Sequence, residues 1–134
     1  MLFSKSLPKL ARHSLIAGCC FAMLSVALGA FAAHGLKAYL SDYALGIVNT
    51  AADYQMYHAL GLLVIGLIAA ILDKRAIKWA FYSMLSGIIL FSGSLYLLAF
   101  TGSKFFAVFT PIGGALFILA WGLLILALVR HEQA

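Results

Sequence analysis

The stretch YQMYHALGLLVIGLIAAIL (residues 54–72) decides the fold, because it carries no formal charge and lies between Asp53 and Asp73. A helix needs about 20 predominantly apolar residues to cross a bilayer core of about 30 Å. The run is continuous rather than alternating, so it does not fit a strand of a membrane barrel. The stretch therefore predicts a membrane-spanning helix.

Three further stretches lack formal charge, and the 134 residues are 65% hydrophobic and 10% charged. A soluble domain is about half apolar and a quarter charged, so this is the composition of a membrane protein. The length leaves room for one domain, covering 1–134. We predict an all-α, four-helix transmembrane bundle. Its spans lie at about 14–36, 54–72, 79–100 and 105–129.

The basic residues indicate the orientation of these spans. Most of the nine Lys and Arg residues lie in the amino-terminal segment, the 73–78 loop and the carboxyl tail, whereas the other two loops carry only Lys37 and Lys104. By the positive-inside rule both termini are predicted to be cytoplasmic. The net charge of +5 favours anionic lipid head groups as partners. Nucleic acid is not expected, because no basic face exists outside these short flanks.

The amino-terminal segment resembles a secretory signal, with basic residues, an apolar stretch and Ala-Phe-Ala at 30–32. Cleavage after Ala32 would leave three helices and put the new terminus outside, against the charge of the 73–78 loop. We therefore interpret the segment as an uncleaved first span. Cys19 and Cys20 are adjacent and point in different directions, so we interpret them as small packing residues.

The first outer loop, 37–53, has a helical pattern of its own. Ser41 can cap the start of this helix, and Asp42, Asn49 and Asp53 lie off its apolar stripe. We predict an amphipathic helix on the outer surface that can run straight into the second span. The apolar stripe consists of Leu40, Tyr43, Ala44, Ile47, Val48 and Ala51.

The start of the fourth span allows two interpretations. Thr110 suits an N-cap and Pro111 suits the first helical position, so we favour a helix that starts at Pro111. The alternative is one longer helix kinked at Pro111.

Polar residues gather in the predicted outer half of every span, whereas the inner halves are almost purely aliphatic. His58, for example, lies roughly 7 Å below Asp53 along the second span. On a helical wheel, Asp53, Tyr54, Tyr57, His58 and Gly61 share an arc of about 140°, and Gln55 lies outside it. The candidate ligand-binding residues are His34, Tyr54, His58, Ser92, Ser94, Tyr96, Thr110 and Pro111.

Two interpretations of this cluster stay open. Ionisable residues inside a membrane are functional candidates, but they can also satisfy one another in a structural hydrogen-bond network. A haem held by His34 and His58 and proton-coupled export using Asp53 are weaker alternatives. A hydrolase built from Ser92 or Ser94 with His58 and Asp53 is another. No catalytic motif occurs, so we predict no enzyme activity, no metal and no cofactor.

Small residues recur at intervals of four in the first span, at Ser25, Gly29 and Ala33. Such stripes let helix backbones approach closely within lipid, and they are compatible with a homo-oligomer or a membrane-protein partner. The predicted helix-packing residues are Ser25, Gly29, Gly61, Gly93, Gly113 and Gly114.

Four motifs occur in order: VALGAFAAHGLK (26–37), YQMYHALGLL (54–63), LFSGSLYLLA (90–99) and TPIGGALFILAWGLL (110–124). Through them residues 14–128 resemble the YgdD-like family, small four-span bacterial inner-membrane proteins forming a domain of unknown function with eukaryotic relatives. Ala32 stands where relatives often have glycine, and the family fills position 53 with various residues, so Asp53 is not expected to be a mechanistic acid. The matching signature positions are Gly29, His34, Gly35, Tyr54, Gln55, His58, Ser92, Gly93, Ser94, Tyr96, Pro111, Gly113, Gly114, Trp121 and Gly122.

The resemblance implies an inner-membrane protein without an assigned reaction and with a link to membrane integrity. We therefore expect a structural or accessory membrane component. The alternative is a binding or transport protein with an outer-leaflet pocket for a lipid, a quinone or another small amphipathic ligand.

Overall fold

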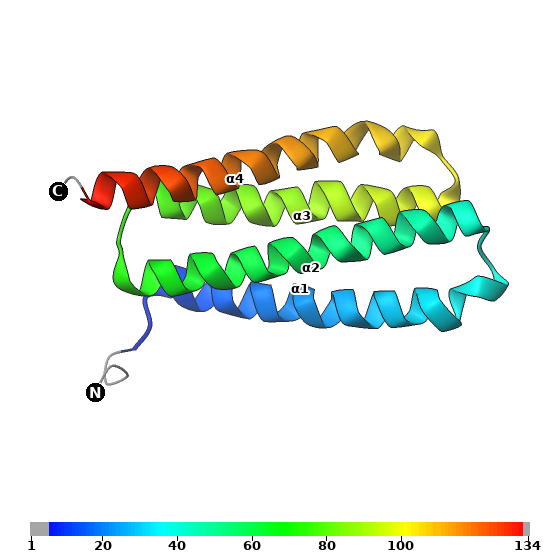
Figure 1. Ribbon diagram of the computed structural model, residues 1–134, viewed down its shortest axis with the longest axis horizontal. Coiled ribbons are helices and arrows are strands. Elements are labelled where there is room, and N and C mark those ends of the chain that lie inside the picture. Colours follow the sequence, from blue (N-terminus) through cyan, green and yellow to red (C-terminus); the bar gives the residue numbers. More distant parts are fainter. Residues whose placement is uncertain (1–5, 133–134) are drawn as a thin grey trace.

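The computed structural model describes residues 6–132, and in this part of the chain the regular structure is helical throughout. Four long helices alternate in direction, and two short 3-10 helices lie at one end of the molecule (Figure 1). The elements are α1 (Lys9–His34), η1 (Leu36–Ala38), α2 (Asp42–Ile71), α3 (Arg75–Thr101), η2 (Lys104–Val108) and α4 (Phe109–Glu132).

The long helices follow chain order across the molecule. α1 packs on α2, α2 on α3, and α3 on α4, so that α1 and α4 lie at opposite edges (Figure 1). The end that carries η1 and η2 is called the loop end below. The opposite end, where α1 begins and α4 ends, is called the terminal end.

Each of the four helical segments is long and apolar enough to cross a membrane. The predicted all-α fold with four spans is therefore confirmed. The amphipathic segment predicted in the first outer loop is the first part of α2, which continues from Asp42 to Ile71 without a break. Ser41 caps it as predicted, because the backbone N–H of Ala44 donates to Ser41 Oγ at 3.2 Å. Tyr43, on the predicted apolar stripe, has an exposed ring.

The predicted start of the fourth helix at Pro111 was wrong. The chain turns helical at Lys104 in η2 and becomes α-helical at Phe109, so Pro111 is the third residue of α4. Proline fits there because the first four N–H groups of a helix have no partner within it. Thr110 is not a cap, and its hydroxyl instead hydrogen-bonds to Ser94 of α3 at 2.6 Å.

The core is divided between two groups of buried side chains. The larger group joins all four helices and includes Leu62, Ile65, Met84 and Phe117. A smaller group at the loop end packs Leu36 of η1 onto Val48 of α2. Much of α1 and α4 stays outside both groups, as expected for helices whose apolar faces meet lipid.

The terminal-end half is not purely aliphatic, which corrects the prediction from sequence. Ser14 of α1 is fully buried and donates to the backbone oxygen of Leu62 in α2 at 2.6 Å. Gly66 is equally enclosed, because a Cβ there would lie 2.7 Å from the Leu15 side chain and 3.1 Å from Ala11 O. A polar contact and a small residue therefore hold α1 against α2 at this depth.

Candidate functional site

Gln55 is the centre of the main polar network, although the helical wheel placed it outside the polar arc. Its side chain is 3% exposed. Gln55 Nε2 donates to Phe21 O of α1 at 2.8 Å, and the Tyr96 hydroxyl of α3 donates to Gln55 Oε1 at 2.8 Å. One amide therefore ties three helices together. The correction has a simple cause: α2 turns the face of Gln55 inward, whereas Asp53 and Tyr57 are exposed.

Two serines of the adjacent helices hydrogen-bond to the neighbouring turn of α2. Ser25 Oγ of α1 donates to Ala52 O at 2.6 Å, and Ser92 Oγ of α3 donates to Ala51 O at 2.8 Å. A helical carbonyl has a second lone pair, so it can accept such a bond without losing its bond within the helix. Both hydroxyls are therefore engaged in contacts between helices.

Ser94 and Thr110 form the corresponding link between α3 and α4. Their hydroxyl oxygens lie 2.6 Å apart, and Ser94 Oγ also donates to Phe91 O at 2.9 Å. Since Ser94 has one hydroxyl hydrogen and gives it to Phe91 O, Thr110 is the donor in the bond between the two hydroxyls.

His58 of α2 packs against α4. Its ring stacks on Phe117, with 3.4 Å between ring centres and 9° between planes. His58 Nδ1 lies 2.8 Å from Tyr54 O. A carbonyl oxygen only accepts, so Nδ1 carries the hydrogen and Nε2 of the neutral ring is a free acceptor.

Beside this ring lies a cavity of about 560 Å³, open on one side, here called the His58 groove. The walls are mainly aromatic, with Tyr54 and Trp121 half exposed at their edges. The ring of Phe91 stands 4.7 Å from that of Tyr54 and closes the wall toward α3. The lining residues are Tyr54, His58, Phe91, Pro111, Gly114, Ala115, Phe117, Ile118 and Trp121.

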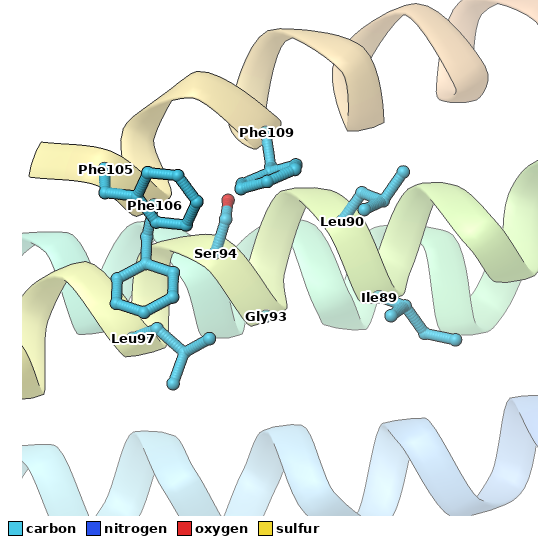
Figure 2. A pocket seen from close by; sticks show the side chains of 8 residues that line it. All are labelled: Ile89, Leu90, Gly93, Ser94, Leu97, Phe105, Phe106 and Phe109. Atoms are coloured by element: carbon cyan, nitrogen blue, oxygen red, sulfur yellow. The ribbon is translucent and has the colours of Figure 1, made fainter.

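A second cavity, here called the Phe groove, has a volume of about 430 Å³ and lies between α3 and the η2–α4 segment. Figure 2 shows the Phe105 and Phe109 rings on the side of the η2–α4 segment, the Phe106 ring reaching toward Leu97 of α3, and Ser94 pointing toward Phe109. Ser94 is its single polar side chain, and that hydroxyl already has two partners. The α3 residues are Ile89, Leu90, Gly93, Ser94 and Leu97.

The predicted ligand-binding residues thus separate into four groups. Tyr54, His58 and Pro111 line the His58 groove. Ser92 and Tyr96 belong to the network on α2, and Ser94 and Thr110 bond to each other. His34 is exposed at the end of α1 and lines neither groove.

The predicted packing residues also divide. Ser25 is buried in the α1–α2 contact described above. A Cβ on Gly61 would lie 2.9 Å from Met84 Cε and 3.2 Å from Trp121, and one on Gly113 would overlap the backbone of Phe91. A Cβ on Gly114 would lie 3.8 Å from the Phe91 ring, which is an ordinary van der Waals contact. Gly29 and Gly93 pack against no other helix within residues 6–132, because no neighbour lies within 4 Å of the position a Cβ would take.

Several residues in these contacts were not among the predicted site residues. Gln55 had a usable signal, because an amide within an otherwise apolar span needs partners in lipid. Ser14 gave the same signal at the terminal end of the molecule, because it too is a polar side chain within an apolar span. Phe117 and Trp121 gave none, since aromatic residues are common in spans for reasons of packing alone.

Neither a three-ligand metal cluster nor the hydrolase arrangement is assembled in the part of the chain that the structure describes. Within residues 6–132 no three His, Cys, Asp or Glu side chains come together as metal ligands. Ser92 and Ser94 bond to carbonyls and to Thr110 rather than to His58, so the imagined hydrolase arrangement is not formed. Cys19 and Cys20 are free thiols on the exposed surface of α1 rather than packing residues.

Comparisons with known proteins place this architecture in a family. A family model described as a protein of unknown function (DUF423) matches residues 28–114. A UPF0382 membrane protein of Staphylococcus epidermidis is 47% identical over 116 residues, which cover 87% of this chain and 94% of that protein. The UPF0382 membrane protein YwdK of Bacillus subtilis is 42% identical over 118 residues, covering 87% and 96%. No solved structure matches the chain.

A UPF0382 membrane protein of Haemophilus influenzae is 48% identical over 96 residues, which cover 72% of this chain and 77% of that protein. The family model, which spans residues 28–114, includes Gln55 and Tyr96 of the network and five of the nine residues that line the His58 groove, but not Phe21 or Phe117. Four apolar helices and membrane-protein relatives agree with each other. The chain is an integral membrane protein of the DUF423 (UPF0382) family, whose molecular function is unassigned.

Proposed function

We propose that the protein is a structural or accessory component of the bacterial inner membrane, linked to membrane integrity, and not an enzyme. The observation that carries this proposal is the Gln55 network, in which one amide joins α1, α2 and α3. Side chains that bond to neighbouring helices strengthen packing in lipid, where apolar contacts alone give little drive. The proposal includes kinship with the YgdD-like proteins and their eukaryotic relatives.

The proposed orientation has both termini in the cytoplasm. Arg12, Arg75, Lys78 and Arg130 lie at the terminal end, where the positive-inside rule puts the cytoplasmic side. Single cysteines can test this in a chain whose Cys19 and Cys20 are replaced by serine. A membrane-impermeant maleimide added to spheroplasts should label Ser103→Cys and not Arg130→Cys. Labelling of Arg130→Cys alone would reverse the orientation.

Membrane integrity can be tested in a bacterial strain that lacks its own copy of the protein. We expect greater uptake of a membrane-impermeant DNA dye after osmotic shock, because the cytoplasmic membrane has lost a packing component. The wild-type chain and His58→Phe should restore the barrier, whereas Gly113→Ala, which disturbs the α3–α4 contact, should not. Unchanged dye uptake in the deletion strain would reject this function.

A second candidate function is the binding of a small amphipathic membrane ligand in the His58 groove. The specific observation in its favour is the combination of a 560 Å³ open cavity with a histidine on its wall. Membrane lipids are the proposed partners in the first case and the source of the ligand in the second. The exposed apolar side chains of α1, such as Ile16, Met23 and Val26, offer a further face for lipid, a second copy or a membrane-protein partner.

A further inference from the structure

We propose that the His58 groove binds a hydroxylated aromatic ring with an apolar tail, and that the hydroxyl of this ligand donates a hydrogen bond to His58 Nε2. The inference rests on the second candidate function and adds to it the chemical class of the ligand and the atom that recognises it. Quinols and other phenolic lipids belong to this class.

The first step is the direction of the hydrogen bond. Tyr54 O accepts from His58 Nδ1 at 2.8 Å, and this contact sets the tautomer. Nε2 then has a lone pair and no hydrogen. A ligand group that only accepts, such as an ether or a quinone carbonyl, cannot bond to it. A hydroxyl can.

The second step is that Nε2 has no partner in the described chain. The side chain of His58 is 7% exposed, and its one hydrogen bond is made by Nδ1. Within residues 6–132 every fully buried side-chain nitrogen and oxygen has a partner, so Nε2 is not sealed inside the core. Because His58 lines the groove, the small accessible part of the ring opens there. The groove therefore contains an unpaired acceptor.

The third step is the surrounding medium. His58 comes 14 residues before Leu72, the C-cap of α2, and therefore lies about 21 Å from that end of the helix at about 1.5 Å per residue. This depth is within a hydrocarbon core of about 30 Å. Few water molecules are available there to satisfy the acceptor, so a donor on a lipid-soluble molecule gains more than it would at an aqueous surface.

The fourth step is the shape of the walls. The imidazole is stacked on Phe117, and Tyr54 lies nearly parallel to it at 6.1 Å between ring centres. The ring centre of Trp121 lies 6.1 Å from that of the imidazole, and the two ring planes are tilted by 57°. Flat side chains on several walls leave a space that suits a planar ring, through stacked and edge-to-face contacts. The open side of the groove lets a tail extend into lipid.

The test uses two probes of the same shape, para-nonylphenol and para-nonylanisole, added to the full chain in lipid nanodiscs. The methyl ether keeps the ring and the tail and removes the donor. Binding is followed by quenching of Trp121 fluorescence. The chain carries Trp79→Phe, because Trp79 lies near the start of α3 and would add fluorescence from outside the groove. The state of Nε2 is followed by ¹⁵N NMR of histidine-labelled protein, with His58→Phe used to assign the His58 signals.

We expect the phenol to bind on the order of tenfold more tightly than the ether, because one hydrogen bond separates them. The phenol alone should shift the Nε2 signal. The preference should disappear in His58→Phe, which keeps a ring against Phe117, and remain in His34→Phe, whose histidine is outside the groove. The comparison of the two probes on the wild-type chain requires no variant, so it holds even if His58→Phe is unstable.

Each of the other outcomes would overturn the inference in its own way. Equal binding of both probes, abolished by filling the groove with Ala115→Phe, would leave the second candidate function standing but reject the donor. Binding that survives Ala115→Phe would put the site elsewhere. No quenching by either probe would reject the second candidate function together with the inference.

Discussion

The α1–α2 contact and the α3–α4 contact hold their helices together by different means. Across α1–α2, hydroxyls of Ser14 and Ser25 donate to carbonyl oxygens of the facing helix, both at 2.6 Å. Across α3–α4, a glycine lies against backbone at Gly113, and the Phe117 ring fits over Gly87, where a Cβ would come within 2.6 Å of it. Both contacts contain a hydrogen bond and closely packed glycines, since Gly18 and Gly66 lie in the first and the Ser94–Thr110 bond in the second. What differs is that hydroxyls bond to the facing backbone in the first contact, whereas a ring fits over a glycine in the second.

The difference explains where the two grooves described above lie. A hydroxyl bonded to a facing backbone oxygen requires the two helices to be close along that line. Large rings keep α4 at a distance wherever no glycine receives them, and both the His58 groove and the Phe groove are lined by residues of α4 or η2. We call the half with α1 and α2 the hydrogen-bonded half and the half with α3 and α4 the ring-packed half, and both grooves border the ring-packed half.

The largest effect should come from the tightest contact of the ring-packed half. Gly113→Ala adds a Cβ that overlaps the backbone of Phe91, which cannot move as a side chain could. We expect the free energy of unfolding in bicelles, measured by steric trapping, to fall by about 3 kcal/mol. Gly122→Ala is the matched control in the same helix, because its Cβ would meet nothing within 4 Å. Equal effects of the two changes would contradict this account of the contact.

A smaller loss should follow from removing the amide in the hydrogen-bonded half. Gln55→Leu leaves the Tyr96 hydroxyl without its acceptor and the Phe21 carbonyl without its donor from α2. The expected loss in the free energy of unfolding is about 1–2 kcal/mol.

The bond itself can be isolated with a double-mutant cycle of Gln55→Leu and Tyr96→Phe. Hydrogen bonds between helices in lipid have coupling energies that average about 0.6 kcal/mol and reach about 1.7 kcal/mol. We expect a value toward the upper limit, because Gln55 is 3% exposed. Additive effects of the two substitutions would mean that the contact contributes no stability of its own.

Removal of one hydroxyl should have a still smaller effect. Ser25→Ala loses the bond to Ala52 O and leaves a carbonyl that keeps its partner within α2. The free energy of unfolding should fall by about 0.6 kcal/mol. Ser86→Ala, at an exposed position of α3, serves as the control and should have no measurable effect. A larger loss in the control would show that lipid or a partner protein contacts Ser86.

The smallest effect is expected at Gly29, a signature position that nonetheless has open space around it. Gly29→Ala should leave the free energy of unfolding unchanged or raise it by up to about 1 kcal/mol, because alanine favours the helix. The oligomeric state, measured by single-molecule photobleaching in nanodiscs, should also stay the same. A loss of a dimer in this variant would instead assign the face of Gly29 to a second copy of the chain.

Local features of the sequence were sufficient to predict the helices. Uncharged stretches of about 20 residues predict spans because their backbone must bond internally in lipid. Ser41 predicts its own helix start, since a cap needs only the next three residues. Pro111 did not predict the start of its helix, because proline is acceptable at several positions in the first turn. Residues 104–108 before it are already helical, and α4 begins at Phe109.

The tertiary structure decides which polar side chains of α2 bond to neighbouring helices. A helical wheel orders Asp53, Gln55 and His58 by angle, but it contains no neighbour, so it cannot tell which angle faces a donor on α1 or α3. Gln55 bonds to Phe21 and Tyr96, which are 34 and 41 residues away in sequence.

The sequence by itself determined the number of spans, their approximate limits and the place of the chain in a membrane, because each depends on residues within one turn or one span. Tertiary packing decided that Gln55 hydrogen-bonds to two other helices, that His34 lies outside both grooves, and that His58 borders one of them. The physical reason is that hydrogen bonds and steric fit act over a few ångströms, between helices whose relative rotation no single segment specifies.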